Sequence, residues 1–110
     1  MKKIFIIPFH VKRVENSIMP SELDRAYVSC YSLSETYVQA TKNALEKLKL
    51  DGLYPEEILE PIYELEPNSW SQHIEEQWSK YADYMPTQEE FNERMASDDI
   101  VYGPFASYRT

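Results

Sequence analysis

The apolar run at residues 3–14 constrains the fold more than any other part of the sequence. Its apolar side chains at alternate positions would share one face of a β-strand: Phe5, Ile7, Phe9 and Val11. Ile4 and Ile6 make the opposite face apolar as well, a pattern typical of a strand inside a sheet that is covered on at least part of its second side. Because Pro8 has no amide hydrogen, we expect a bulge or an unpaired position there.

A second β-rich run follows at residues 25–33, after a connection over residues 15–24. Tyr27 and Tyr31 would lie on one face of this strand and Cys30 on the other. The connection is long enough to allow an antiparallel hairpin between the two runs. The sequence therefore predicts that the first two strands are neighbours in one sheet.

Three matches to the capping-box pattern predict where helices begin. They are Ser32 with Glu35, Ser69 with Gln72, and Thr87 with Glu90. The first helix would run to about Leu50, before a stop signal at Asp51-Gly52. The second is the cleanest amphipathic helix, ends at Pro86, and carries apolar residues at helical spacing: Trp70, Ile74, Trp78, Tyr81 and Met85. The third is shorter and carries Phe91 and Met95.

Two further strands are predicted at Ile58–Glu66 and at residues 99–108. Pro61 favours an edge position for the former, where its glutamates would discourage aggregation. A bulge or bend is expected in the latter at Gly103-Pro104. The order β-β-α-β-α-α-β predicts one α+β domain over residues 1–110, with a mostly antiparallel four-stranded sheet and helices on one face. The uncovered face would carry aromatic and charged residues.

The composition excludes several classes of chemistry. The chain has two glycines, too few for a Gly-rich nucleotide fingerprint, and one cysteine, which excludes a disulfide framework and a Cys-rich zinc site. His73 and Glu76 have the spacing of a helical metal-ligand pair, but such sites need a second pair on a facing helix. Cys30, in mid-strand among aromatics, has the setting of a small buried hydrophobe. We therefore expect no catalytic residues, no metal and no cofactor.

Charge is concentrated in the second half of the chain. The formal net charge is −8, and residues 54–110 hold thirteen acids against Lys80, Arg94 and Arg109. A surface this negative repels phosphate backbones, so we expect no direct binding of nucleic acid. It would attract a basic partner and speed their encounter, although an acidic surface also serves solubility alone.

The N-terminal apolar run could be mistaken for a signal peptide. It is short, contains Pro8 and His10, and ends in Lys12-Arg13 rather than at a small-residue cleavage site. No segment reaches the roughly 18 apolar residues of a membrane span. The lone Cys30 fits a reducing compartment. We expect a cytoplasmic protein with no membrane partner.

The whole-chain plan resembles the small acidic immunity proteins of bacterial contact-dependent growth inhibition and related polymorphic toxin systems. The plan consists of the N-terminal hairpin, the Ser34–Leu50 helix, the Ile58–Glu66 strand, the Trp70–Tyr84 helix and a terminal aromatic strand. The resemblance implies a cytoplasmic inhibitor that binds a toxin domain tightly and blocks or distorts its active site. Many such toxins are nucleases with basic substrate grooves, where an acidic patch can stand in for phosphates.

We therefore expect a non-catalytic immunity protein that binds a basic toxin domain through carboxylates and tyrosine. The expected toxin-facing residues are Glu60, Glu64, Glu66, Asp83, Tyr84, Asp98 and Asp99. One alternative is a phage or mobile-element nucleic-acid mimic that inhibits a host nuclease or defence complex. Another is an enzyme that uses Cys30, His10 or His73 in a cleft. A third is a homodimer in which the Ile58–Glu66 edge pairs with its twin; the sequence leaves monomer and homodimer open.

Overall fold

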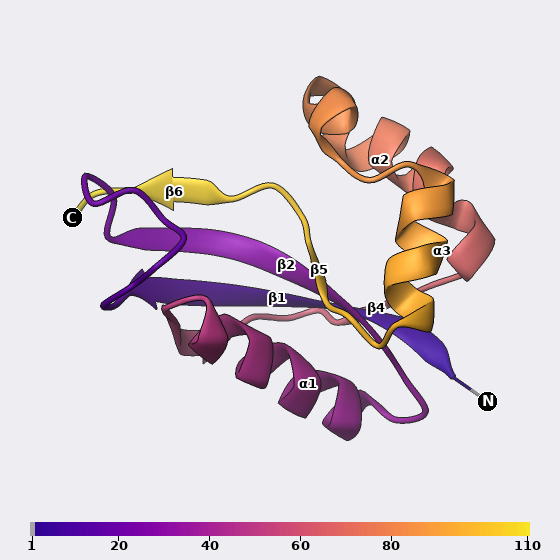
Figure 1. Cartoon of the computed structure of the whole chain (residues 1–110), viewed down its shortest axis with the longest axis horizontal. Coiled ribbons are helices and arrows are strands. Elements are labelled where there is room, and N and C mark those ends of the chain that lie inside the picture. Colours follow the sequence, from indigo (N-terminus) through magenta and orange to yellow (C-terminus); the bar gives the residue numbers. More distant parts are fainter. Residues whose placement is uncertain (1) are drawn as a thin grey trace.

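A computed structural model of the protein describes residues 2–110, and a long hairpin forms its centre (Figure 1). Strand β1 (Lys3–Arg13) pairs antiparallel with β2 (Arg25–Ser34), from Lys3 opposite Ser34 to Lys12 opposite Arg25. The prediction of neighbouring antiparallel strands is confirmed. In the second half of β1, buried Phe9 and Val11 alternate with the less buried Pro8 and His10. This alternation favours the observed register, because a slip of one residue would turn every side chain to the other face.

Each edge of the sheet consists of two short strands. Strands β3 (Leu53–Ile58) and β4 (Tyr63–Leu65) both pair with β1, and β5 (Val101–Tyr102) and β6 (Ala106–Tyr108) both pair with β2. The order across the sheet is β3-β1-β2-β5, and the pairings are antiparallel. The predicted α+β class with a mostly antiparallel sheet is therefore confirmed.

Prolines divide both edges. The single strand expected at Ile58–Glu66 is replaced by β3 and β4, because the segment around Pro61 leaves the sheet between them. The strand expected at residues 99–108 is divided in the same way at Gly103-Pro104. A proline supplies no amide hydrogen to a ladder, which favours the breaks at Pro61 and Pro104. Pro55 instead stays within β3, opposite Val11 and beside the register shift between His10 and Val11.

Pro8 occupies a position that needs no donor. It lies where β1 passes from its pairing with β4 to its pairing with β3. Its carbonyl accepts a hydrogen bond from the amide of Leu59 at 2.8 Å, in the segment between those strands. Pro8 is paired with Ser29 on the β2 side and has no strand partner on the β3–β4 side, so the expectation of an unpaired position holds on that side alone. The bulge in this region lies between His10 and Val11.

Helix α1 (Tyr37–Leu50) begins later than predicted. Its N-cap is Thr36, whose hydroxyl accepts a hydrogen bond from the amide of Gln39 at 3.1 Å. The capping box predicted at Ser32 is wrong, because β2 continues through that residue and buries it completely. The helix ends at Asp51 and Gly52, as predicted.

The second helix ends at Trp78, before the apolar pattern that predicted it through Met85. Helix α2 (Trp70–Trp78) follows a 3-10 turn, η1 (Pro67–Ser69), and continues as the 3-10 helix η2 (Ser79–Tyr84). Ser69 makes no side-chain cap, so that predicted box is also wrong; the Gln88 side chain instead accepts from the amide of Ser71 at 3.2 Å.

Helix α3 (Gln88–Ala96) begins where the sequence predicts. Thr87 and Glu90 form both bonds of the capping box. The Glu90 amide donates to the Thr87 hydroxyl at 3.1 Å, and the Thr87 amide donates to the Glu90 carboxylate at 2.9 Å. Two amides at the start of the helix are thus satisfied by local side chains.

The helices cover both faces of the sheet, which corrects the prediction that they lie on one face. Alternate β1 residues pack with α1 in one cluster: Phe5, Ile7, Phe9, Val11, Ala40, Ala44 and Leu48. The other face packs with α2 and α3 in a second cluster: Ile4, Ile6, Tyr31, Trp70, Ile74, Phe91 and Met95. Figure 1 shows α1 on one side of the sheet and α2 and α3 on the other. Ile4 and Ile6 need this second cover because exposure would leave their apolar surface in water.

Candidate functional site

The most acidic stretch of the chain forms one edge of the sheet and the helix above it. Residues 54–79, here called the acidic segment, contain seven glutamates and no lysine or arginine. They run through β3, β4, η1 and α2. All seven are exposed: Glu56, Glu57, Glu60, Glu64, Glu66, Glu75 and Glu76. Within residues 2–110, only Glu56 and Glu64 form ion pairs, with Arg25 at 2.7 Å and Lys3 at 3.1 Å.

Three of the predicted binding residues belong to the acidic segment. Glu60 lies in the turn between β3 and β4, Glu64 lies on β4, and Glu66 directly follows that strand. Exposed tyrosines flank these carboxylates, with Tyr54 on β3 exposed by 58% and Tyr63 on β4 by 61%. Tyrosine beside carboxylate provides contact area at low conformational cost, a common property of protein interfaces.

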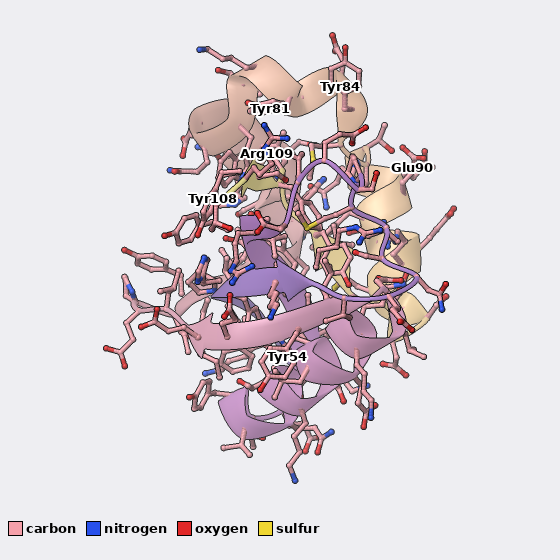
Figure 2. All side chains as sticks on the ribbon, turned by 90° about the vertical axis from the view of Figure 1, so that its left-hand side faces the viewer. Tyr54, Tyr81, Tyr84, Glu90, Tyr108 and Arg109 are labelled. Carbon is pink, nitrogen blue, oxygen red and sulfur yellow. The ribbon has the colours of Figure 1, made fainter. Side chains whose placement is uncertain are left out.

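Asp83 and Tyr84 lie on η2, at the tip of the arm that joins α2 to α3. Tyr84 is 85% exposed, and Figure 2 shows it at the far end of the molecule from Tyr54. This pair adjoins the acidic segment in sequence through Lys80 and Tyr81. It extends the negative surface without being part of the sheet edge.

Asp98 and Asp99 lie at the opposite end of α3 from Asp83 and Tyr84, about 13 Å along the helix axis for its nine residues. Asp98 forms an ion pair with Lys2 at 3.4 Å. The Asp99 carboxylate accepts from Arg94 Nε at 2.9 Å and from the Ile100 amide at 2.8 Å. Burial alone would raise the pKa of Asp99, but these hydrogen bonds hold that pKa below its usual value. Asp99 therefore stabilises the turn into β5.

The seven predicted residues thus occupy three separate places. Glu60, Glu64 and Glu66 lie within one short stretch, while the η2 tip and the turn after α3 each hold two of the others. Of these places, the β3–β4 edge has the densest exposed negative charge.

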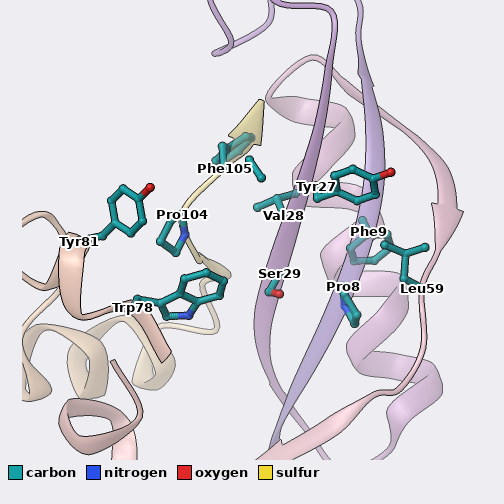
Figure 3. Close-up of a pocket in the computed structure, with 11 residues that line it drawn as sticks. Pro8, Phe9, Tyr27, Val28, Ser29, Leu59, Trp78, Tyr81, Pro104 and Phe105 are labelled. Carbon is teal, nitrogen blue, oxygen red and sulfur yellow. The ribbon is translucent and has the colours of Figure 1, made fainter. Parts of the chain in front are cut away.

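A cleft lined by aromatic residues was not predicted from the sequence. It consists of two cavities, of about 160 and 500 Å3, which share Ser29 and Trp78 in their walls. Figure 3 shows Trp78 and Tyr81 across the cleft from Ser29 and Tyr27. Trp78 and Tyr81 fit the apolar stripe of a buried helix, but Trp78 is only half-buried and Tyr81 is 47% exposed. Trp78 is the last residue of α2 and Tyr81 lies in η2.

Three side chains in this cleft form a hydrogen-bonded chain. Trp78 Nε1 donates to the Tyr31 hydroxyl at 3.3 Å, and that hydroxyl is hydrogen-bonded to His73 Nε2 at 2.6 Å. The hydroxyl can donate in this bond only to a neutral His73 that carries its proton on Nδ1. Burial lowers the pKa of His73, against the smaller opposing effect of Glu76. Burial also raises the pKa of Tyr31 to about 12, so its hydroxyl keeps its proton at neutral pH.

The residues considered for catalysis do not assemble. Cys30 is fully buried in the cluster under α1, and burial raises the pKa of its thiol. His10 lies on the opposite sheet face, stacked on Tyr27 with ring centroids 4.7 Å apart and bonded to the Tyr108 hydroxyl at 2.5 Å. His73 shares that opposite face. A Cys30–histidine pair is therefore prevented by the sheet itself.

Within residues 2–110, no group of three histidine, cysteine, aspartate or glutamate residues could hold a metal ion. No helix in the described part of the chain is both long and apolar enough to span a membrane.

Comparisons with known proteins give no relative for this chain: no family model matches it, and neither the curated proteins nor the solved structures give a match.

Proposed function

We propose that the protein is a non-catalytic inhibitor that binds a basic protein domain through the acidic segment, in the manner of a cytoplasmic immunity protein against a toxin. One observation carries the proposal: seven exposed glutamates without a lysine or arginine among them, on a sheet edge and its adjoining helix. Negative charge at this density attracts a positively charged surface and speeds its association.

The sheet edge supplies the rigid part of this interface. Strands β3 and β4 are held by β1; Glu64 projects from β4, and Glu60 and Glu66 lie in the segments next to these strands. A backbone that is already ordered loses little further conformational entropy on binding, which favours tight association. A toxin domain whose substrate groove is basic would be blocked when this edge occupies the groove.

The test starts with capture of the partner on the tagged chain from lysate of its own source, followed by an activity assay of the captured protein. The chain should inhibit that activity at a one-to-one ratio. A Glu60→Lys, Glu66→Lys variant should lose inhibition because it reverses two charges of the acidic segment.

The matched control is Glu22→Lys, Glu46→Lys, which makes the same change in net charge at two exposed sites outside the acidic segment. This variant should inhibit as the wild type does. Equal inhibition by both double variants would remove the acidic segment from the interface. Release of the captured partner by added DNA would instead favour a nucleic-acid mimic.

A further inference from the structure

We propose that the aromatic cleft beside Trp78 receives an arginine side chain of the basic partner. The inference rests on the proposed function, because it supposes such a partner, and it identifies the group that anchors it. The walls of the cleft come from β4 and α2, two elements of the acidic segment, and its floor comes from β1 and β2.

The cleft presents aromatic rings to whatever enters it. Tyr63 lies on the β4 side, Trp78 and Tyr81 on the helical side, and Tyr27 on the sheet, while the Tyr31 ring is buried beneath the cleft. A planar guanidinium group stacks well on such rings and is attracted to their faces. The larger cavity, about 500 Å3, lies within the usual range of ligand-binding pockets.

The electrostatics of the cleft favour a cation. No lysine or arginine lines either cavity, and Glu64 lines the larger one. His73 also lines the larger cavity, where its Nε2 is hydrogen-bonded to the Tyr31 hydroxyl and burial lowers the pKa of its ring. An entering guanidinium group therefore meets the Glu64 carboxylate, which also pairs with Lys3 at 3.1 Å, and no lysine or arginine in the cavity walls.

The cleft also offers acceptors for the donors of a guanidinium group. Ser29 and Gln77 both line the larger cavity. In the described part of the chain, neither side chain makes a hydrogen bond to another residue. Arginine carries five N–H donors, so the hydroxyl of Ser29 and the amide oxygen of Gln77 supply the directional contacts that rings alone lack.

The two tryptophans allow a direct test. Trp78 lines the cleft, whereas Trp70 is fully buried and stacked on Phe91 with centroids 4.1 Å apart. The indole N–H signals of the uniformly 15N-labelled chain would be followed by NMR during titration with a hexa-arginine peptide. We expect the Trp78 signal to move saturably and the Trp70 signal to stay in place. A hexa-citrulline peptide, equal in length but uncharged, should leave both signals unchanged.

A pair of tyrosine variants ties the effect to the cleft. Tyr63→Ala removes a ring from the wall and should raise the Kd of hexa-arginine about 5- to 10-fold. Tyr37→Ala removes an exposed ring from α1, outside both the cleft and the acidic segment, and should leave that Kd unchanged. An unchanged Trp70 signal would verify that each variant keeps its fold.

Two results would overturn the inference. In one, hexa-arginine shifts backbone signals of the exposed glutamates but not the Trp78 indole, which would leave the acidic segment as the binding surface and remove the cleft from it. In the other, hexa-citrulline moves the Trp78 signal as far as hexa-arginine does, so the cleft does not select a cation. The failure of the proposed function is detected separately, by the inhibition assay with charge-reversed variants.

Discussion

At the scale of single residues, Gly52 lies at a position that leaves no room for a side chain. Its φ is +70°, and a Cβ there would lie 2.5 Å from the Cα of Ser17. Gly52→Ala should therefore lower the free energy of unfolding by about 2 kcal/mol or more, since both the conformation and the neighbouring backbone oppose a side chain. Urea denaturation measures the change.

Gly103 provides the control for that substitution. A Cβ at Gly103 would meet its nearest atom, on the Tyr31 ring, at 3.5 Å, an ordinary contact. Gly103→Ala should change the free energy of unfolding by less than about 1 kcal/mol. An equal loss of unfolding free energy in the two alanine variants would contradict the close contact of Gly52 with Ser17 in the turn between α1 and β3.

His73 couples folding to pH. Because burial lowers its pKa in the folded chain, the unfolded chain binds a proton first as pH falls below about 6.5. The stability from neutral His73 is thus present above that pH and is lost as pH falls through the lower, folded pKa. The Tyr31 hydroxyl is hydrogen-bonded to the ring, and the nearby Glu76 carboxylate acts against the lowering of the pKa.

His73→Gln keeps an acceptor for the Tyr31 hydroxyl and removes the titration. Between about pH 7 and pH 5.5, the free energy of unfolding should fall less for this variant than for the wild type. Denaturation curves at several pH values provide the measurement. Identical slopes for the two proteins would show that His73 does not titrate with folding.

At the scale of elements, the three capping-box matches have different outcomes that stability measurements can separate. Thr87 makes its cap, so Thr87→Ala should cost about 1 kcal/mol of the free energy of unfolding. Ser69 makes no side-chain cap, so Ser69→Ala should cost almost nothing. The prediction fails if urea denaturation gives equal losses for both variants.

The same elements show what the sequence can and cannot predict. The apolar pattern of residues 3–14 is sufficient to predict the central strand, because Phe5, Ile7, Phe9 and Val11 occupy alternate positions and so share one strand face. The Ser32 box fails because long-range pairing of β2 with β1 overrides a local helix signal. The helix predicted through Met85 becomes 3-10 after Trp78. Apolar spacing indicates which side of a helix is apolar, but it does not indicate which other element will cover that side.

The candidate site was predictable only in part, because its cleft depends on contacts between elements that lie far apart in the sequence. Glu60, Glu64 and Glu66 were predicted as binding residues from charge and edge position, and the structure exposes all three on one sheet edge. The cleft depends on how α2 lies over β2. Trp78 and Tyr81 therefore resemble core residues in sequence, although in the structure they line an open cavity.

At the scale of the whole molecule, the two faces of the sheet differ in how completely helices cover them. Helix α1 and one sheet face form a core that includes Cys30. On the other face, α2 and α3 cover Ile4 and Ile6 but leave Tyr27 exposed by 47%. The aromatic cleft opens at this partly covered side, whereas the acidic segment follows the sheet edge and packs against the cluster under α1 through Ile62.

The central claim is that the acidic segment binds a basic protein, and the salt dependence of that binding tests it most directly. The Kd of the captured partner would be measured between about 50 and 300 mM salt for the wild type and both double variants. We predict a Kd that rises with salt for the wild type and for Glu22→Lys, Glu46→Lys, with weaker and less salt-dependent binding for Glu60→Lys, Glu66→Lys. The same Kd and the same salt dependence in all three proteins would contradict the claim.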